Sequence, residues 1–220
     1  MLDTDNPIEK YLCFTEDWVF CHIPKNGGTT FRHAFLDTHN YTQYKTAPPF
    51  PEIALWHQTP SWWEKNDPRI QEKQWICITR NPYARYVSWF FFIQSRQKAS
   101  NYKYIDWRKN TFGEFVKNNF LENIVQVHPQ YTSSDTWRTW NVSDSQTHWY
   151  NDVLNMRYFS LENDLLEMEE YTKIPFSSTI RNRTEHKPYQ EYYTQEIGDI
   201  VYDQFRSDFE AFGYEKETFK

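Results

Sequence analysis

Two short apolar segments of this chain each run directly into a turn and then a helix, and this pattern constrains the fold most strongly. The first, residues 18–23, is stopped by Pro24 and predicts a buried strand. The second, Gln74–Thr79, predicts another strand, and a long aromatic segment from Pro82 to about Gln97 follows it with proline in the first helical turn. Strands that alternate with helices predict an α/β fold with a mainly parallel central sheet flanked by helices. Ligands of such sheets bind beyond the carboxyl ends of the strands.

The rest of the chain extends this alternation. A helix is expected after the first strand. It is expected to be capped by Thr29 or Thr30 and to reach about Asp37. A later strand is expected at residues 156–160. Residues 128–152 have no clear period and predict a long loop, of the kind that forms lids or binding segments. Further helices are expected at residues 61–65, at 111–119 behind the capping box Thr111-Phe-Gly-Glu114, at 161–171 and at 189–209.

Length and charge limit the class of protein. A chain of 220 residues fits one domain, and its aromatic residues, 20% of the total, are expected to build much of the core. A net charge of −6 argues against general nucleic-acid binding. Between residues 80 and 109, however, seven basic residues accompany one acid, Asp106, and this local excess suits an anionic ligand. The seven are Arg80, Arg85, Arg96, Lys98, Lys103, Arg108 and Lys109.

Cysteine usage and hydropathy bear on compartment and metals. The three cysteines are an odd number without a CxxC pair, so we expect neither a disulfide framework nor a metal site. His148 and His186 have no paired spacing for zinc. No run approaches the roughly 18 apolar residues of a membrane span, and the N-terminus lacks the apolar region of a signal peptide. We therefore expect a soluble, cytoplasmic protein, unless the chain is a trimmed lumenal domain.

The first strand leads into the motif Ile23-Pro-Lys-Asn-Gly-Gly-Thr-Thr30. A helix N-terminus favours a phosphate through its backbone N–H groups and dipole, and paired glycines let the backbone approach that phosphate. Lys25 precedes the glycines and no lysine follows them, so the motif differs from the nucleotide-triphosphate loop GxxxxGK[ST]. A lysine in this place can face the leaving-group oxygen of a 5′-phosphate as that oxygen gains negative charge. The alternative is a simple glycine turn with a solvated lysine.

The second strand leads into Thr79-Arg-Asn-Pro-Tyr-Ala-Arg-Tyr-Val-Ser-Trp89. Arg80 stands at the carboxyl end of the strand, and Ser88 follows two helical turns later. An arginine fork and a hydroxyl near one turn predict a second phosphate site, and two phosphate sites imply a bisphosphorylated nucleotide. Taken singly, Arg80 would pair with a surface carboxylate and Ser88 would pack in the interior.

Together the motifs resemble those of the sulfotransferases that use 3′-phosphoadenosine-5′-phosphosulfate (PAPS). The motif at residues 23–30 resembles their 5′-phosphosulfate loop, and residues 80–88 are similar to their 3′-phosphate motif. The resemblance spans most of the chain and implies one sulfotransferase domain, residues 1–220, with a P-loop-like fold. Other segments resemble the branch of heparan- and chondroitin-type carbohydrate sulfotransferases and their bacterial relatives. These are His57-Gln-Thr-Pro60, residues 112–116, Pro129-Gln130, residues 158–164, Asn182, Tyr192-Tyr193 and residues 208–214.

This resemblance implies roles for particular residues. Lys25 would contact the bridging phosphosulfate oxygen, and Arg80 with Ser88 would hold the 3′-phosphate. The 5′-phosphate would be held by Asn26, Gly27, Gly28, Thr29 and Thr30. Asn26 stands where the family often has threonine, which leaves the backbone cradle intact and removes a hydroxyl. The implied donor is PAPS and the product is 3′-phosphoadenosine-5′-phosphate (PAP), without a metal; the implied partner is a carbohydrate or another hydroxyl-bearing acceptor.

The acceptor hydroxyl needs a base, and the carbohydrate branch often has a histidine just upstream of the second phosphate strand. Here that residue is His57, and a histidine suits the role because its unperturbed pKa of about 6.5 keeps the neutral form available near pH 7. His128 is the alternative base or an acceptor contact, and Glu64 and Asp67 are further candidates. His22 is expected to be structural.

The predicted reaction is an in-line sulfuryl transfer in which positioning and charge neutralisation at the leaving oxygen supply most of the catalysis. A nucleotide kinase or a non-catalytic nucleotide-binding module remains the alternative. The kinase is disfavoured because the lysine precedes the glycines. Five tryptophans in irregular segments are candidates to stack on sugar rings: Trp62, Trp63, Trp137, Trp140 and Trp149.

Overall fold

The computed structural model describes residues 11–39, 56–97, 111–120, 144–176 and 185–220. These residues form two compact units. The first unit contains the described residues up to 79 together with residues 146–176. The second contains residues 80–97, 111–120, 144–145 and 185–220.

The first unit is built on a four-stranded sheet with the order β1-β2-β3-β4. Its strands are β1 (Cys13–Phe14), β2 (Trp18–Cys21), β3 (Gln74–Thr79) and β4 (Met156–Ser160). Strand β3 runs parallel to both β2 and β4, whereas β1 runs antiparallel to β2. The predicted α/β fold with a mainly parallel sheet is therefore confirmed. The antiparallel edge strand was not expected, because two residues are too short to show a period.

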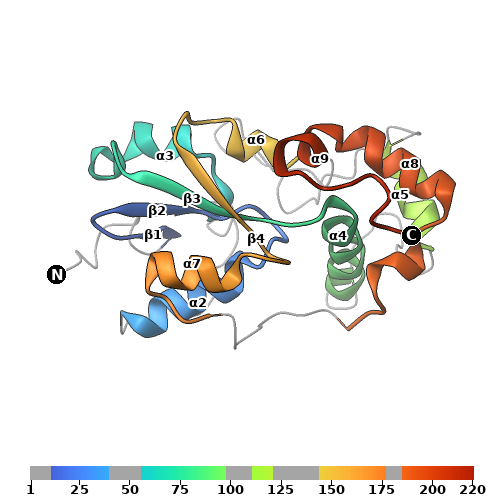
Figure 1. The fold of residues 1–220 in the computed structure, drawn as a ribbon, viewed down its shortest axis with the longest axis horizontal. Coiled ribbons are helices and arrows are strands. Elements are labelled where there is room, and N and C mark those ends of the chain that lie inside the picture. The colour runs from blue at the N-terminus through green and yellow to red at the C-terminus, as the bar shows by residue number, and fades with distance from the viewer. Residues whose placement is uncertain (1–10, 40–55, 98–110, 121–143, 177–184) are drawn as a thin grey trace. The chain divides into compact units, whose positions relative to one another are not determined.

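Helices cover both faces of this sheet. Helices α2 (Gly28–Thr38) and α7 (Leu165–Thr172) lie on one face (Figure 1). The other face is covered by α3 (Pro60–Asn66), the 3-10 helix η3 (Pro68–Ile70) and α6 (Thr147–Tyr150). Successive strand residues point to opposite faces, so neighbours such as Ile76 and Cys77 enter different cores.

The second unit is helical. It contains α4 (Pro82–Gln97), α5 (Phe112–Phe120), the 3-10 helix η6 (Tyr189–Tyr192), α8 (Gln195–Gln204) and α9 (Arg206–Phe212). Aromatic side chains join these helices, and the Tyr86 ring centroid lies 5.2 Å from that of Phe115 and 5.7 Å from that of Phe205. The predicted capping box opens α5, since the Glu114 carboxylate accepts from the Thr111 N–H at 2.6 Å and the Glu114 N–H donates to the Thr111 hydroxyl at 3.2 Å.

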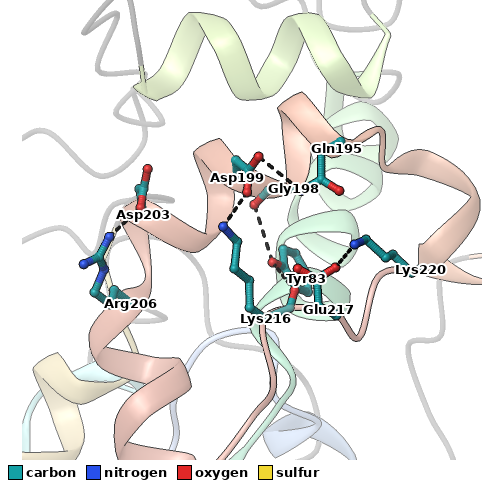
Figure 2. A network of polar contacts seen from close by, with 9 residues as sticks. All are labelled: Tyr83, Gln195, Gly198, Asp199, Asp203, Arg206, Lys216, Glu217 and Lys220. Carbon is teal, nitrogen blue, oxygen red and sulfur yellow. Dashed lines mark hydrogen bonds and ion pairs between the residues drawn. The ribbon is translucent and has the colours of Figure 1, made fainter.

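The C-terminal residues are held against α4 and α8 (Figure 2). The Tyr83 hydroxyl donates to the Lys216 carbonyl oxygen at 2.8 Å, and the Lys216 ammonium pairs with Asp199 at 2.6 Å. The Phe219 ring lies so close to Gly198 that a Cβ there would stand 2.6 Å from it. The glycine in α8 thus makes room for the last aromatic residue of the chain.

Two expected helices differ from the structure. The C-terminal helix at 189–209 is divided into η6, α8 and α9, because Tyr193 is extended and the Thr194 hydroxyl caps α8 by accepting from the Ile197 N–H at 3.3 Å. The helix expected at 161–171 begins only at Leu165. The residues before it form a turn in which the Ser160 N–H donates to the Asp164 carboxylate at 2.8 Å.

The loop predicted at 128–152 is also partly wrong. Its end contains the short helix α6, whereas its residues up to 143 lie outside the described part of the chain. The three cysteines are buried free thiols, as expected. Within the described ranges, no helix has the length and apolar character needed to cross a membrane.

Candidate active site

The loop between β2 and α2 forms an open helix N-terminus. Strand β2 ends at Cys21, and α2 begins at Gly28 with Gly27 as its N-cap in the left-handed conformation, φ 84°. The expected capping by Thr29 or Thr30 is wrong, because the Gly27 carbonyl accepts from the Thr30 N–H at 2.9 Å instead. The first turn of α2 carries no side-chain cap and no acidic residue. The N–H groups of a helix start that precede this first bonded N–H lack intrahelical partners, which suits an anion.

Gly28 and Lys25 have unusual surroundings or conformations within this loop. A Cβ on Gly28 would lie 2.1 Å from Cδ2 of His22, so only glycine lets the helix approach this imidazole. Lys25 is half-buried and has a φ of 69°, which is uncommon for a residue with a side chain. Such strained positions concentrate at functional sites. The backbone around Lys25 is therefore constrained by the left-handed conformation of Lys25 itself and by the close approach of Gly28 to His22.

The Asn26 side chain points into the protein. Asn26 is buried, and its Nδ2 donates to the Ile78 carbonyl oxygen at 2.8 Å and to Oε1 of Gln146 at 2.6 Å. Asn26 can therefore contact a phosphate only through its backbone, because its side-chain amide is used inside the protein. The resemblance would place a threonine hydroxyl at this position. Here the position has an amide instead, and this amide makes two internal hydrogen bonds.

His57 is held at two points in the same unit. Its Nδ1 lies 2.8 Å from the carbonyl oxygen of His22. Since a carbonyl oxygen only accepts, Nδ1 carries the proton and Nε2 carries the lone pair of the neutral ring. The Trp149 indole N–H donates to the His57 carbonyl oxygen at 2.9 Å. These contacts fix the tautomer of His57 and anchor its backbone.

Electrostatics keep both histidines of the site neutral. Burial lowers the pKa of His57 to about 4; the hydrogen bond to His22 offsets part of this effect, and the positive charge of Lys25 adds to it. Burial, together with the charges of His57, Arg32 and Lys25, holds the pKa of His22 well below its usual value. Lys25 therefore lies close enough to influence both imidazoles, and at pH 7 His57 is available to accept a proton.

These lowered pKa values predict a pH-dependent stability. An unfolded histidine titrates near pH 6.5, whereas folded His57 titrates near pH 4, so between these values the unfolded state binds more protons. The free energy of unfolding should therefore fall as the pH drops from 6.5 to 4, by about 1–3 kcal/mol from His57. The free energy of unfolding, measured with urea at several pH values across this window, should depend less steeply on pH for His57→Ala than for the parent.

The matched control for this slope is His186→Ala, which removes an imidazole from the second unit. It should keep the parent's pH dependence. Identical slopes for His57→Ala and the parent would contradict the lowered pKa of His57.

The other candidate bases have structural contacts or lie outside the described residues. Oε1 of Glu64 accepts from the Trp75 indole N–H at 2.7 Å. The buried Asp67 carboxylate pairs with Arg69 at 2.7 Å and accepts from its backbone N–H at 2.9 Å. His128 lies outside the described residues. Among the described candidates, His57 is the one whose pKa the charge of Lys25 lowers.

The second motif opens α4 in the second unit. Asn81 orients this helix start, since its Oδ1 accepts from the Tyr83 N–H at 2.9 Å and its Nδ2 donates to the Thr218 hydroxyl at 2.9 Å. Arg80 is half-buried directly before this cap, and Ser88 is buried two turns along α4.

A second arginine of this motif was counted in the sequence only as part of a basic segment. Arg85 is buried, and its guanidinium donates to the Asp144 carbonyl oxygen at 2.8 Å. Burial lowers its pKa to about 10; Asp208 and Asp144 oppose that shift, and the charge of Arg80 adds to it. Arg80 and Arg85 thus lie close enough for their charges to interact, and the charge of Arg85 is offset by Asp208 and Asp144.

The tryptophans expected to stack on sugars include core residues. Trp63 and Trp149 are almost fully buried in the core beneath α3 and α6, so the stacking role is wrong for these two. Trp62 is half-buried, with its ring perpendicular to that of Trp63 at a centroid distance of 5.0 Å. Trp137 and Trp140 lie outside the described residues.

Comparison with known families completes the description of the site. Within the described ranges, no group of three or more histidine, cysteine or carboxylate side chains is arranged to hold a metal ion. The family model described as "Sulfotransferase family" matches residues 13–215, a span that includes both motifs and His57. No curated protein matches the chain.

Proposed function

The chain belongs to the sulfotransferase family, and we propose that it transfers a sulfuryl group from PAPS to a hydroxyl of a carbohydrate, with His57 as the general base. The single observation that carries this proposal is the pairing of an open helix N-terminus with a tautomer-fixed histidine in one unit. The charge of Lys25 acts on His57 and on His22. Sulfuryl transfer as such follows from the family, whereas donor, acceptor and base are parts of the proposal.

The donor fits the residues of the loop. We propose that residues 26–30 bind the 5′-phosphate at the N-terminus of α2, mainly through the backbone N–H groups that precede Thr30. Gly27 supports this role through its left-handed conformation, and Gly28 through its close approach to His22. Arg80 and Ser88 would bind the 3′-phosphate, Arg80 through charge-assisted hydrogen bonds and Ser88 through its hydroxyl.

The chemistry then needs two side chains. Nε2 of neutral His57 takes the proton of the acceptor hydroxyl as the acceptor oxygen forms a bond to sulfur. The bond between sulfur and the 5′-phosphate oxygen breaks, and its electron pair stays on that oxygen. Lys25 neutralises the developing charge there, and PAP is the leaving product. The proton on His57 passes to solvent, so no metal is needed in the scheme.

The carbohydrate acceptor rests on the resemblance of segments such as His57-Gln-Thr-Pro60 and Tyr192-Tyr193 to the carbohydrate branch. In the structure, Tyr192 and Tyr193 lie beside Phe112 on α5, with ring centroids 6.0 and 5.0 Å away. A panel of sulfate-free oligosaccharides, assayed with labelled PAPS, tests this part separately from donor binding. Transfer to phenols or simple alcohols alone would overturn the acceptor proposal and leave the donor proposal standing.

The donor proposal is tested by calorimetry with PAP, ADP and ATP. The protein should bind PAP most tightly, because it alone carries the 3′-phosphate. Arg80→Ala should weaken PAP binding by about 1.5–3 kcal/mol, the range for a lost charge-assisted hydrogen bond, while ADP binding barely changes. Arg206→Ala is the matched control, since Arg206 is an exposed residue of the same unit paired with Asp203. Equal losses for PAP and ADP would show that Arg80 does not hold the 3′-phosphate.

A further inference from the structure

A buried amide pair ties the loop that presents Lys25 to helix α6. Gln146 has no exposed surface, and its Oε1 accepts from Nδ2 of Asn26 at 2.6 Å. The same Nδ2 donates to the Ile78 carbonyl oxygen at 2.8 Å, near the carboxyl end of β3. Asn26 thus links three chain segments through one amide group.

Gln146 is itself fixed by its backbone. Its carbonyl oxygen accepts from the N–H groups of Trp149 and Tyr150, both at 3.1 Å, and so begins α6. The side chain therefore enters the core from a defined helical turn. Removing its oxygen would leave the buried Asn26 amide with one acceptor fewer, which costs more than a solvent-exposed hydrogen bond.

The same short helix also contacts the segment of the proposed base. Trp149 is almost fully buried, and its indole N–H donates to the His57 carbonyl oxygen at 2.9 Å. Gln146 and Trp149 are three residues apart, so they lie on one side of a helical turn. One turn of α6 thus holds the loop of Lys25 at one residue and the segment of His57 at another.

We propose that Gln146 and Trp149 are positioning residues, and that α6 sets the placement of the Lys25 loop relative to His57. This inference rests on the proposed function, in which Lys25 acts on the leaving oxygen and His57 on the acceptor. In-line transfer demands that these groups stand on opposite sides of the reacting sulfur. Misplacement by about 1 Å can lower such a rate by about 10²-fold. Neither Gln146 nor Trp149 needs to touch a substrate for this role.

The first test needs no ligand. Hydrogen–deuterium exchange of the ligand-free protein should be several-fold faster in the peptide spanning residues 22–33 when Gln146 is changed to Leu. The matched control is Gln74→Leu, because Gln74 is a second glutamine of this unit with a hydrogen-bonded side chain, which donates to Trp75 and Asn155 at the opposite end of β3. This control should leave exchange at 22–33 unchanged. Parent-like exchange in Gln146→Leu would overturn the role of the amide pair.

The second test measures coupling in turnover. Gln146→Leu and Asn26→Ala should each lower kcat by about 10-fold or more, and the double variant should be no slower than the slower single variant. Circular dichroism spectra of both variants that match the parent's guard against a simple failure to fold. Trp149→Phe should lower kcat and shift the acidic limb of the pH–rate profile, because it releases the His57 carbonyl.

These experiments distinguish a failure of the proposed function from a failure of the positioning role of Gln146 and Trp149. If the parent does not bind PAP, the proposed function fails, and the exchange experiment still decides whether Gln146 orders the loop. If the parent is active, independent and additive losses in Asn26→Ala and Gln146→Leu would overturn the positioning role. A Trp149→Phe variant with the parent's kcat and pH profile would remove Trp149 from the proposal.

Discussion

His57→Ala is expected to lower the turnover number by about 10²–10⁴-fold and to leave nucleotide affinity nearly unchanged. The reason lies in the hydrogen bond between Nδ1 and the His22 carbonyl, which leaves the lone pair of neutral His57 on Nε2. Alanine removes the proton acceptor and leaves all residues of the loop at 23–30 in the chain. Single-turnover transfer from labelled PAPS to an accepted oligosaccharide measures the chemical step, and calorimetry with PAP measures the affinity.

The pH dependence identifies the base more sharply than the rate. In the free enzyme, kcat/KM should fall as the pH drops through about 4, because His57 becomes protonated there. A bound anion stabilises the imidazolium, so the corresponding limb of kcat should lie at higher pH. His57→Ala should abolish both limbs.

His128→Ala is the matched control for this experiment, because His128 was the alternative base. It should keep the acidic limb and most of the turnover. If His128→Ala loses the limb and His57→Ala keeps it, the two roles must be exchanged. If neither variant loses it, a carboxylate such as Glu64 becomes the leading base, despite its hydrogen bond to Trp75.

Lys25→Ala should reduce turnover by about 10²–10³-fold while weakening PAP binding only a few-fold. The positive charge of Lys25 is needed most at the 5′-phosphate oxygen, where the bond to sulfur breaks. The negative charge on that oxygen develops only in the transition state. The comparison of kcat with the dissociation constant of PAP therefore separates catalysis from binding. A normal turnover number would remove Lys25 from the mechanism.

The control for Lys25→Ala must separate charge from backbone conformation. Lys173 suits this purpose, since it is an exposed lysine with a φ of 61°, close to the 69° of Lys25, and it ends α7. Lys173→Ala changes a lysine with similar backbone geometry and leaves the site intact. Turnover of this variant should equal that of the parent; an equal loss in both variants would point to a general effect on the fold.

Local signals in the sequence predicted most of the framework. The apolar runs at Trp18–Cys21 and Gln74–Thr79 predicted two parallel strands because buried strands need unbroken apolar side chains. Proline at the start of α4 and the capping box of α5 predicted two helix starts, since these residues act on their own backbone. The glycines after Lys25 likewise predicted a turn at a helix N-terminus.

What the sequence by itself determined was therefore the α/β order of elements, the two motifs after strands β2 and β3, and the family that they indicate. Only the tertiary structure decided that Asn26 turns inward to Gln146, 120 residues away, and that Trp149 holds the His57 segment, 92 residues away. It also decided the low pKa of His57, which depends mainly on burial. The physical reason is that hydrogen bonds between distant segments and desolvation arise from packing, which leaves no period or spacing in the chain.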